Sequence, residues 1–354
     1  MNMLRFFHRN WKRQAMVCII LHSVNLFLCA ESQPEAVDIR EKSHFQSNSV
    51  YSIDLKNRDL QSYFQALTKG ILQIEDDMGL ELRPYNFPKI ALNFDSSRAP
   101  GLAVRPELII ATLKFLELRG FTKKEVHLVT FYLEGLQEIE WNGRFKGYEL
   151  ITSQYPSYFH ADWFQDSPMP PAMGDRARFF LQYPRDSVTR KLNERKSFLP
   201  ASLFLDTCYW INLSMAKDDP FLGIDGAVSN LTLGASGNTQ RFKKDSTLGP
   251  AMSAEILAIP EIWEKKLFSV IDLTSVQIAG GPEFDAEFLE SDDSIIIGQN
   301  PLYLDYYALK FIEQKRKHRG LLNRFGGKYP LFRFAKELNL GDAYSSNLIE
   351  IKKD

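Results

Sequence analysis

Short apolar runs and helical patterns alternate through the middle of the chain, which is the order typical of a parallel sheet. Residues 89–94 form an apolar run that contains Asn93 near its end, as expected of a buried strand. Pro106 then opens a segment whose apolar residues recur at helical spacing until Gly120, and residues 126–130 form the next apolar run. Strand, loop, helix and strand at this spacing predict a βαβ crossover and therefore parallel strands.

The second half of the chain repeats these patterns. Residues 204–213 predict one or two strands, and residues 267–273 and 294–298 predict two more. Asn300 and Pro301 are typical of the first positions of a helix. Residues 150–200 show no regular period and predict an irregular insertion. The expected fold is therefore α/β, a mainly parallel sheet with flanking helices and Rossmann-like βαβ units.

The chain begins with a segment that resembles an export signal. Residues 1–30 hold four basic residues and no acid, and an apolar run covers residues 15–30. A basic region before a short apolar region predicts a signal peptide and an exported protein, periplasmic or extracellular. An uncleaved membrane anchor and a lipoprotein, attached through Cys29, are the alternatives. We expect residues 31–85 to form a linker and an amino-terminal helical extension, residues 86–320 the α/β core, and residues 321–354 a tail on the core.

Composition narrows the function classes. The 354 residues are 44% hydrophobic and 25% charged, which excludes wholesale disorder and a coiled coil. A net charge of −1 gives no basic field for nucleic acid, so we expect no nucleic-acid partner, and membrane contact only through an uncleaved leader. Without residues 1–30 the charge is −5 and Cys208 is the single cysteine. This excludes internal disulfides, and no Cys-x-x-Cys is present to predict an iron–sulfur cluster.

Candidate chemistry is concentrated after the strand predicted at residues 204–213. Lys217 is followed by the carboxylates Asp218, Asp219 and Asp225, a group that could orient an anion or share protons. Gly223 and Gly226 would let the backbone approach a ligand closely. A tight turn with solvated charges is the alternative. A separate and weaker candidate is a set of metal-ligand residue types, His160, Asp162 and Asp166.

This segment resembles a known family. Its residues align without a gap to the central motif of the domain of unknown function 362 family: Ile211, Asn212, Lys217, Gly223, Gly226, Ala227, Asn230 and Gly234. Asn93 and the helix start at residues 105–108 resemble the family's early strand and helix. Residues 268–273, 280–282 and 300–305 resemble its closing strand, Gly-Pro loop and helix. The resemblance covers about residues 86–315 and implies a redox-linked or ligand-handling enzyme without specifying a reaction.

The sequence departs from the family motif at four positions. Asp219 stands where the family has histidine and Ser229 where it has lysine, while Asp225 replaces threonine and Asn300 replaces aspartate. Asp219 could ligate a hard cation or act as a base, but it cannot replace a cationic donor near neutral pH. The ferredoxin-like cysteine clusters of some members are also absent. The resemblance therefore implies a diverged member.

Together these observations predict a cleft at the carboxyl ends of the strands that binds a small polar or anionic ligand. A divalent cation is left open as a cofactor. The alternatives are a non-catalytic envelope binding or interaction protein on a decayed enzyme scaffold, and carbohydrate contact through the aromatic residues of 155–164. The enzyme hypothesis requires the candidates to converge on one pocket. The candidate catalytic residues are Lys217, Asp219, Asp225 and Asn230, and the candidate ligand-binding residues are Asn93, Arg98, Asn212, Asp218, Asp272 and Asp305.

Overall fold

A computed structural model describes residues 47–97, 100–133, 144–155, 157–201, 208–323 and 325–351. All of them belong to a unit that spans residues 45–354, and the predicted signal peptide lies outside the described residues. Among the helices of the described ranges, none is both long enough and apolar enough to cross a membrane.

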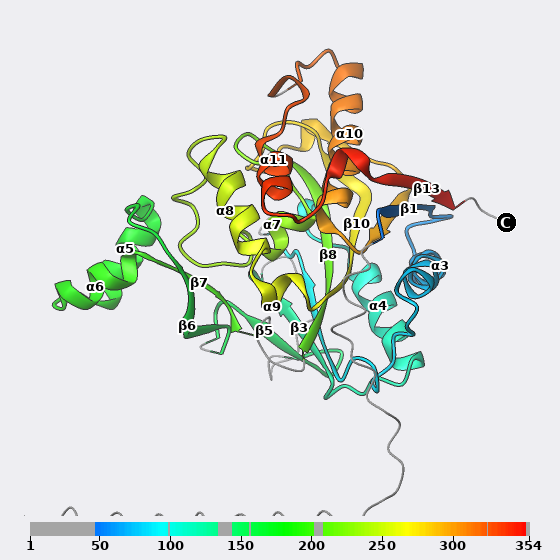
Figure 1. Cartoon of the computed structure of the whole chain (residues 1–354), viewed down its shortest axis with the longest axis horizontal. Helices are drawn as coiled ribbons and strands as arrows, with labels where there is room; N and C mark the ends of the chain where they lie inside the picture. Colours follow the sequence, from blue (N-terminus) through cyan, green and yellow to red (C-terminus); the bar gives the residue numbers. More distant parts are fainter. Residues whose placement is uncertain are drawn as a thin grey trace, which may run out of the picture. The chain divides into compact units, whose positions relative to one another are not determined.

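A mixed sheet, 11-stranded over the described residues, forms the centre of this unit (Figure 1). Its order is β13-β1-β12-β10-β8-β2-β3-β5-β4, with β9 paired to β8 and β11 to β10. The neighbours from β10 through β8, β2 and β3 to β5 are parallel, which confirms the predicted α/β fold. The strands are β1 (Ser49–Asp54), β2 (Lys89–Phe94), β3 (Val126–Thr130), β4 (Arg144–Phe145), β5 (Tyr148–Thr152), β8 (Cys208–Asp219), β9 (Gly223–Asp225), β10 (Lys266–Gln277), β11 (Leu289–Glu290), β12 (Ser294–Gly298) and β13 (Asn347–Ile351).

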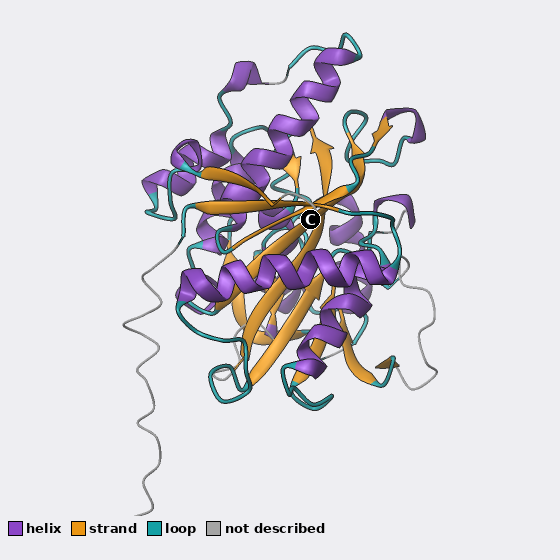
Figure 2. Cartoon of the chain, turned by 90° about the vertical axis from the view of Figure 1, so that its right-hand side faces the viewer, coloured by secondary structure: helices purple, strands orange, loops and turns teal. Residues whose placement is uncertain are grey.

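Helices cover both faces of the sheet, and the strand side chains alternate between them. On β8, Ile211 and Leu213 pack with α3 and α4, whereas Trp210 and Ala216 pack with the helices of the other face. Figure 2 shows the strands from the side on which α3 lies. Both faces of the central strands are therefore buried, as their continuous apolar runs require. The helices are α3 (Leu60–Met78) and α4 (Pro106–Leu118) on one face, and α7 (Ala227–Leu231), α8 (Leu248–Leu257), α9 (Pro260–Trp263), α10 (Pro301–His318) and α11 (Pro330–Glu337) on the other.

The two ends of the described chain are part of the sheet, which differs from the predicted linker and tail. β1 pairs antiparallel with β12 and parallel with β13, so residues 49–54 and 347–351 extend the sheet. The alternation of Val50, Tyr51 and Ile53 is too short to be distinguished from a polar linker in the sequence. β13 holds three apolar residues, but most of the strand is exposed, and so short a segment has no clear strand pattern in the sequence. Its assignment rests on pairing alone.

The irregular insertion predicted at residues 150–200 contains a second, two-stranded sheet. β6 (Phe159–Asp166) pairs antiparallel with β7 (Lys196–Pro200), and α5 (Met173–Gln182) and α6 (Ser187–Glu194) form a helical hairpin between them. Tyr158 of the predicted aromatic wall is fully buried and donates its hydroxyl to the Ala235 carbonyl at 2.8 Å. Its ring packs against Phe131 and Phe159 edge to face. Tyr158 therefore packs the insertion onto the core and cannot contact a carbohydrate.

One buried arginine fixes the base of this insertion. The Arg241 side chain has no exposed surface, and its guanidinium donates to the carbonyls of Met169 at 2.8 Å, Glu194 at 2.9 Å and Arg195 at 2.7 Å. It also donates to Ser197 Oγ at 2.8 Å. These acceptors lie on both sides of the helical hairpin, so one planar donor joins its two ends to the core.

Candidate functional site

The site predicted at the strand ends lies where the strand order reverses. The chain runs from β2 outward to β3 and β5, and then returns to β8 on the opposite side of β2 before it continues to β10. Such a reversal separates the connections that follow two neighbouring strands and leaves room for a ligand at their carboxyl ends. Asn93 of β2 and Asn212 of β8 are direct neighbours in this register.

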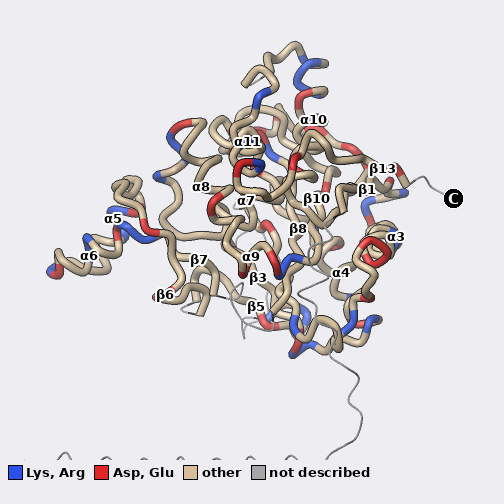
Figure 3. Tube along the Cα trace, in the orientation of Figure 1, with Lys and Arg blue, Asp and Glu red and all other residues tan. Residues whose placement is uncertain are grey.

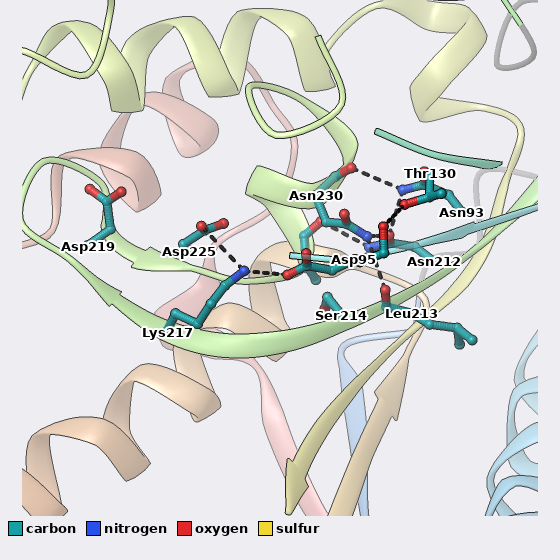
Figure 4. Close-up of polar contacts among 12 residues, drawn as sticks. Asn93, Asp95, Thr130, Asn212, Leu213, Ser214, Lys217, Asp219, Asp225 and Asn230 are labelled. Carbon is teal, nitrogen blue, oxygen red and sulfur yellow. Dashed lines mark hydrogen bonds and ion pairs between the residues drawn. The ribbon is translucent and has the colours of Figure 1, made fainter. Parts of the chain in front are cut away.

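Three predicted asparagines converge at the reversal (Figure 4). Asn212 Oδ1 accepts from Asn93 Nδ2 at 3.1 Å and from Asn230 Nδ2 at 2.7 Å, and Asn212 Nδ2 donates to the Ala227 carbonyl at 2.9 Å. Asn93 Nδ2 also reaches the Asn230 carbonyl at 3.0 Å. Asn93 and Asn212 are buried. The amides join β2 and β8 to α7, so all three of these predicted ligand-binding or catalytic groups already have partners within the protein.

Next to the asparagines, a lysine lies between two carboxylates (Figure 4). Lys217 Nζ donates to Asp95 Oδ2 and lies 3.6 Å from Asp225 Oδ2. Lys217 and Asp225 face each other across the β8–β9 pair, while Asp95 directly follows β2. The side chains of Lys217 and Asp95 are 11% and 12% exposed, and that of Asp225 is 24% exposed. Asp225 is therefore the member that solvent reaches most easily.

Electrostatics give the three groups different tasks. Burial acts to lower the pKa of Lys217, but the Asp225 and Asp95 carboxylates outweigh it and raise that pKa above its ordinary value. Burial acts to raise the pKa of Asp225, but Lys217 and Lys243 hold it at about 2. Burial raises the pKa of Asp95, helped by the charge of Asp225 and opposed by Lys217. Lys217 and Asp225 therefore stay charged near neutral pH, and Asp95 is the carboxyl best suited to exchange a proton.

The structure does not place Asp219 with this cluster. Its side chain is fully buried, and Oδ1 accepts from the backbone N–H groups of Phe221 and Leu222, both at 2.8 Å. Oδ2 lies 3.6 Å from Lys243 Nζ. A carboxylate that accepts two N–H groups two and three residues ahead shapes the turn between β8 and β9. The geometry gives Asp219 a structural task in place of the predicted catalytic one.

Asp305 binds the backbone of α7 rather than a ligand. It has no exposed surface, and its two carboxyl oxygens accept from Ala227 N at 2.6 Å and Val228 N at 3.0 Å. A Cβ at Gly226 would collide with this carboxyl. At Gly223, where φ is +89°, a Cβ would lie 2.7 Å from the ring of Tyr329. The two glycines were predicted to let a ligand approach, and instead they make room for the protein's own side chains.

Asp305 also makes stability depend on pH. Burial raises its pKa to about 8, against the opposing effect of the Val228 and Ala227 N–H groups, from an ordinary value of 3.8. A raised pKa contributes stability that is complete below the unfolded value and is lost as pH rises through the folded value. We expect the wild type to lose about 3 kcal/mol of unfolding free energy between pH 6 and pH 9 from this group.

Urea unfolding of the wild type and Asp305→Asn at pH 6 and pH 9 measures that loss. The variant cannot ionise, so its deficit relative to the wild type should shrink at pH 9. The same deficit at both pH values would contradict a raised pKa at Asp305.

The remaining predicted residues lie apart from the cluster or outside the described ranges. Asp218 is buried, and its Oδ1 lies 3.5 Å from Nη1 of Arg316. Asp272 accepts from the Tyr63 hydroxyl at 2.8 Å and from Thr274 N at 2.9 Å, within the face covered by α3. Both carboxylates therefore have partners within the core, apart from the cluster. Arg98 lies outside the described residues.

The described ranges give no support to the divalent cation left open in the sequence. They hold no group of three or more His, Cys, Asp or Glu residues arranged to bind a metal ion. Of the weaker metal pattern, His160 Nδ1 lies 3.6 Å from Asp162, while Asp166 pairs with Arg195 at 2.6 Å. His160 and Asp162 are both exposed, so no enclosed ligand set forms.

Two members of the site were missed from the sequence. Asp95 directly follows the strand predicted at residues 89–94, and a charge at the carboxyl end of a parallel strand would have identified it. Lys243 lies in a loop, and nothing in the sequence indicates that its side chain is buried next to two carboxylates. Burial acts to lower the pKa of Lys243, but Asp225 and Asp219 raise it. Lys243 therefore adds a second cation behind Asp225.

Comparisons with known proteins give no family. No family model matches the chain, and no curated protein matches it. Three solved chains match its structure, among them a crystal structure of a Thermotoga maritima protein from a structural genomics project. That protein has 12% sequence identity and a TM-score of 0.41, over 72% of this chain and 59% of that one, so this chain covers less than two thirds of its length. The resemblance to the domain of unknown function 362 family stays a prediction.

Proposed function

We propose that the protein is a diverged enzyme that binds a small polar ligand at the cluster of Lys217, Asp95 and Asp225. The observation that carries this proposal is a lysine held between two carboxylates from separate segments at the strand reversal. Asp95 is the candidate acid or base, because its raised pKa favours proton exchange. Asp225 would contact the ligand, and Lys217 would hold both carboxylates in place.

The charges favour one class of ligand over the other that the sequence left open. Lys217 already faces two carboxylates, so it has little capacity to bind a separate anion. Asp225 is the most exposed group and stays ionised, which makes it an acceptor for hydroxyl or ammonium donors. A polyol, a sugar or an amine therefore fits the cluster better than a phosphate or a carboxylate.

The resemblance to the domain of unknown function 362 family supports the same residues. Lys217 and Asn230 stand at motif positions of that family, and Figure 4 shows Lys217 between its two carboxylates and Asn230 among the three asparagines. We further propose that the protein acts outside the cytoplasm, because residues 1–30 have the basic and apolar pattern of an export signal.

A non-catalytic binding protein is the second candidate, and a specific observation favours it. Asp219, at the position of the family's histidine, shapes a turn, and Asp305 binds the backbone of α7. Asn93 and Asn212 likewise have partners within the protein. In this alternative the cluster holds a ligand without converting it.

A thermal-shift screen with polyols, sugars, amines, nucleotides and divalent cations tests the proposal. A ligand of the hydroxyl or amine class should raise the melting temperature of the wild type by mass action and should fail to do so for Asp225→Asn. Asp162→Asn, at an exposed position outside the cluster, should respond as the wild type does. A shift that persists in Asp225→Asn would place the ligand elsewhere.

Asp95→Asn separates the two candidate functions. If the protein is an enzyme, conversion of the bound ligand, followed by mass spectrometry or NMR, should fall by about 10²–10⁴-fold while the thermal shift remains. Binding without any conversion by the wild type would favour the non-catalytic protein.

A further inference from the structure

The helical hairpin of the insertion exposes apolar side chains that lie far from the candidate site. We define the helical arm as residues 173–196, which contain α5, α6 and the turn between them. Figure 1 shows α5 and α6 standing away from the large sheet. The exposed fractions of its apolar side chains are 86% for Met173, 55% for Phe180, 79% for Leu181, 69% for Val188 and 58% for Leu192.

These residues form stripes along the two helices. Met173 and Leu181 are eight residues apart on α5, with the exposed Ala177 midway between them. Val188 and Leu192 are four residues apart on α6. Residues at spacings of four share one face of a helix, so each helix presents an apolar stripe to solvent. A helix that only packed on the core would bury such a stripe.

The helical arm is also strongly basic for its length, as are two other segments of the chain, residues 1–30 and 310–336. It contains seven Lys and Arg residues and three Asp and Glu residues, a net charge of +4, and since the whole chain carries −1, all other residues together carry −5. Basic residues are visible on both helices in Figure 3. Its acids have structural partners: Asp175 pairs with Arg178 at 2.9 Å, Glu194 lies 3.9 Å from Arg190, and Asp186 caps α6 through Thr189 N.

Two cations lie beside the stripes and are not used in contacts within the described protein. Arg176 precedes Ala177 on α5, and Lys191 precedes Leu192 on α6. Both are exposed, and neither side chain forms a hydrogen bond or ion pair with another described residue. Each apolar stripe is therefore bordered by a cation that is available to a partner.

We propose that the helical arm docks on the surface of an anionic phospholipid membrane. A membrane surface satisfies both features at once, because its phosphates lie directly above the acyl chains: the cations bind the phosphates and the stripes enter the boundary below them. An acidic face of a second copy would also pair with the cations, and the light-scattering measurement described below distinguishes it from a membrane. Arg241 and the Asp166–Arg195 ion pair hold the base of the arm, so its orientation is fixed before docking.

Vesicle flotation of the full chain tests this proposal. We expect binding to vesicles of phosphatidylglycerol and phosphatidylcholine in equal parts to exceed binding to pure phosphatidylcholine, and to weaken as salt is added. Leu181→Ser with Leu192→Ser should lower the partition coefficient by about tenfold for each leucine, and Arg176→Glu with Lys191→Glu by at least fivefold for each charge. The basic and apolar segment at residues 1–30 is common to all variants, so differences between their partition coefficients report the helical arm.

Matched controls lie outside the helical arm. Leu118→Ser removes a leucine on α4 that is 72% exposed, and Lys114→Glu reverses an exposed charge on the same helix. Both variants should bind vesicles as the wild type does. Equal binding to neutral and anionic vesicles would overturn the proposal, as would wild-type binding by the arm variants. A change from oligomer to monomer in the arm variants, measured by light scattering without any loss of vesicle binding, would assign the surface to a second copy instead.

Discussion

Replacing Lys217 by methionine is expected to lower the free energy of unfolding by about 3 kcal/mol, because it leaves two carboxylates without their shared cation. Asp95 and Asp225 both face Lys217, and all three side chains are largely enclosed. Methionine fills a similar volume, so the loss reports the charge rather than a cavity. Urea unfolding followed by circular dichroism measures it.

The loss at Lys217→Met should grow with pH. In the wild type Lys217 already opposes the effect of burial on the pKa of Asp95, so removing it raises that pKa further. A raised pKa contributes stability that is complete below the unfolded value of 3.8 and is lost as pH rises through the folded value. The variant is therefore expected to be closer to the wild type at pH 5 than at pH 8.

Two further variants isolate the interaction. Lys217→Met combined with Asp95→Asn removes one of the uncompensated charges and should recover part of the loss, giving a favourable coupling energy in the double-mutant cycle. Lys114→Met, on an exposed position of α4, should change stability by less than about 0.5 kcal/mol. Additive losses for Lys217 and Asp95 would contradict the cluster described here.

The second large effect is expected at Arg241→Met, and it should be local. The substitution leaves the carbonyls of Met169, Glu194 and Arg195 without the donor that the buried Arg241 guanidinium provides, at a cost of about 1 kcal/mol for each bond. These acceptors belong to the insertion, so we expect residues 157–200 to open while the large sheet remains folded. Hydrogen exchange measured by mass spectrometry should show faster exchange in β6, β7 and the two helices of the arm.

Two further variants, a milder substitution of Arg241 and a control in the helical arm, complete this test. Arg241→Lys keeps a positive charge but loses the planar fork, so its effect should be intermediate. Arg185→Met, at an exposed position in the turn of the helical arm, should leave exchange unchanged. Faster exchange throughout the large sheet in Arg241→Met would show that the insertion does not open as a separate unit.

The parts of the fold that the sequence predicted are those with a local period. Residues 89–94 and 126–130 are strands, and Pro106 begins a helix, as their patterns indicate. β1 and β13 were assigned to a linker and a tail, because their strand character depends on pairing with distant segments. A short half-polar segment has no signal of its own until its neighbours are known.

The candidate site was predicted in part for a similar reason. Lys217, Asp225 and the three asparagines meet because strand ends of a parallel sheet share one edge. Asp219 and Asp305 were placed with them because charge and spacing do not reveal burial, and both turned out to bind backbone N–H groups. Asp95, the carboxyl best suited to exchange a proton, lies between the candidates Asn93 and Arg98 and carries no motif that would single it out.

The pairing of β1 has a consequence for how the protein is made. Its partners in the sheet are β12 and β13, so Val50 meets Gly298 and Ser49 meets Asn347. During synthesis β1 stays unpaired until residues 294–298 have left the ribosome, and its second edge stays open until residues 347–351 follow. Closing so long a loop is slow and keeps apolar strands accessible in the meantime. Translation of β12 and then of β13 thus decides when β1 can complete its pairing.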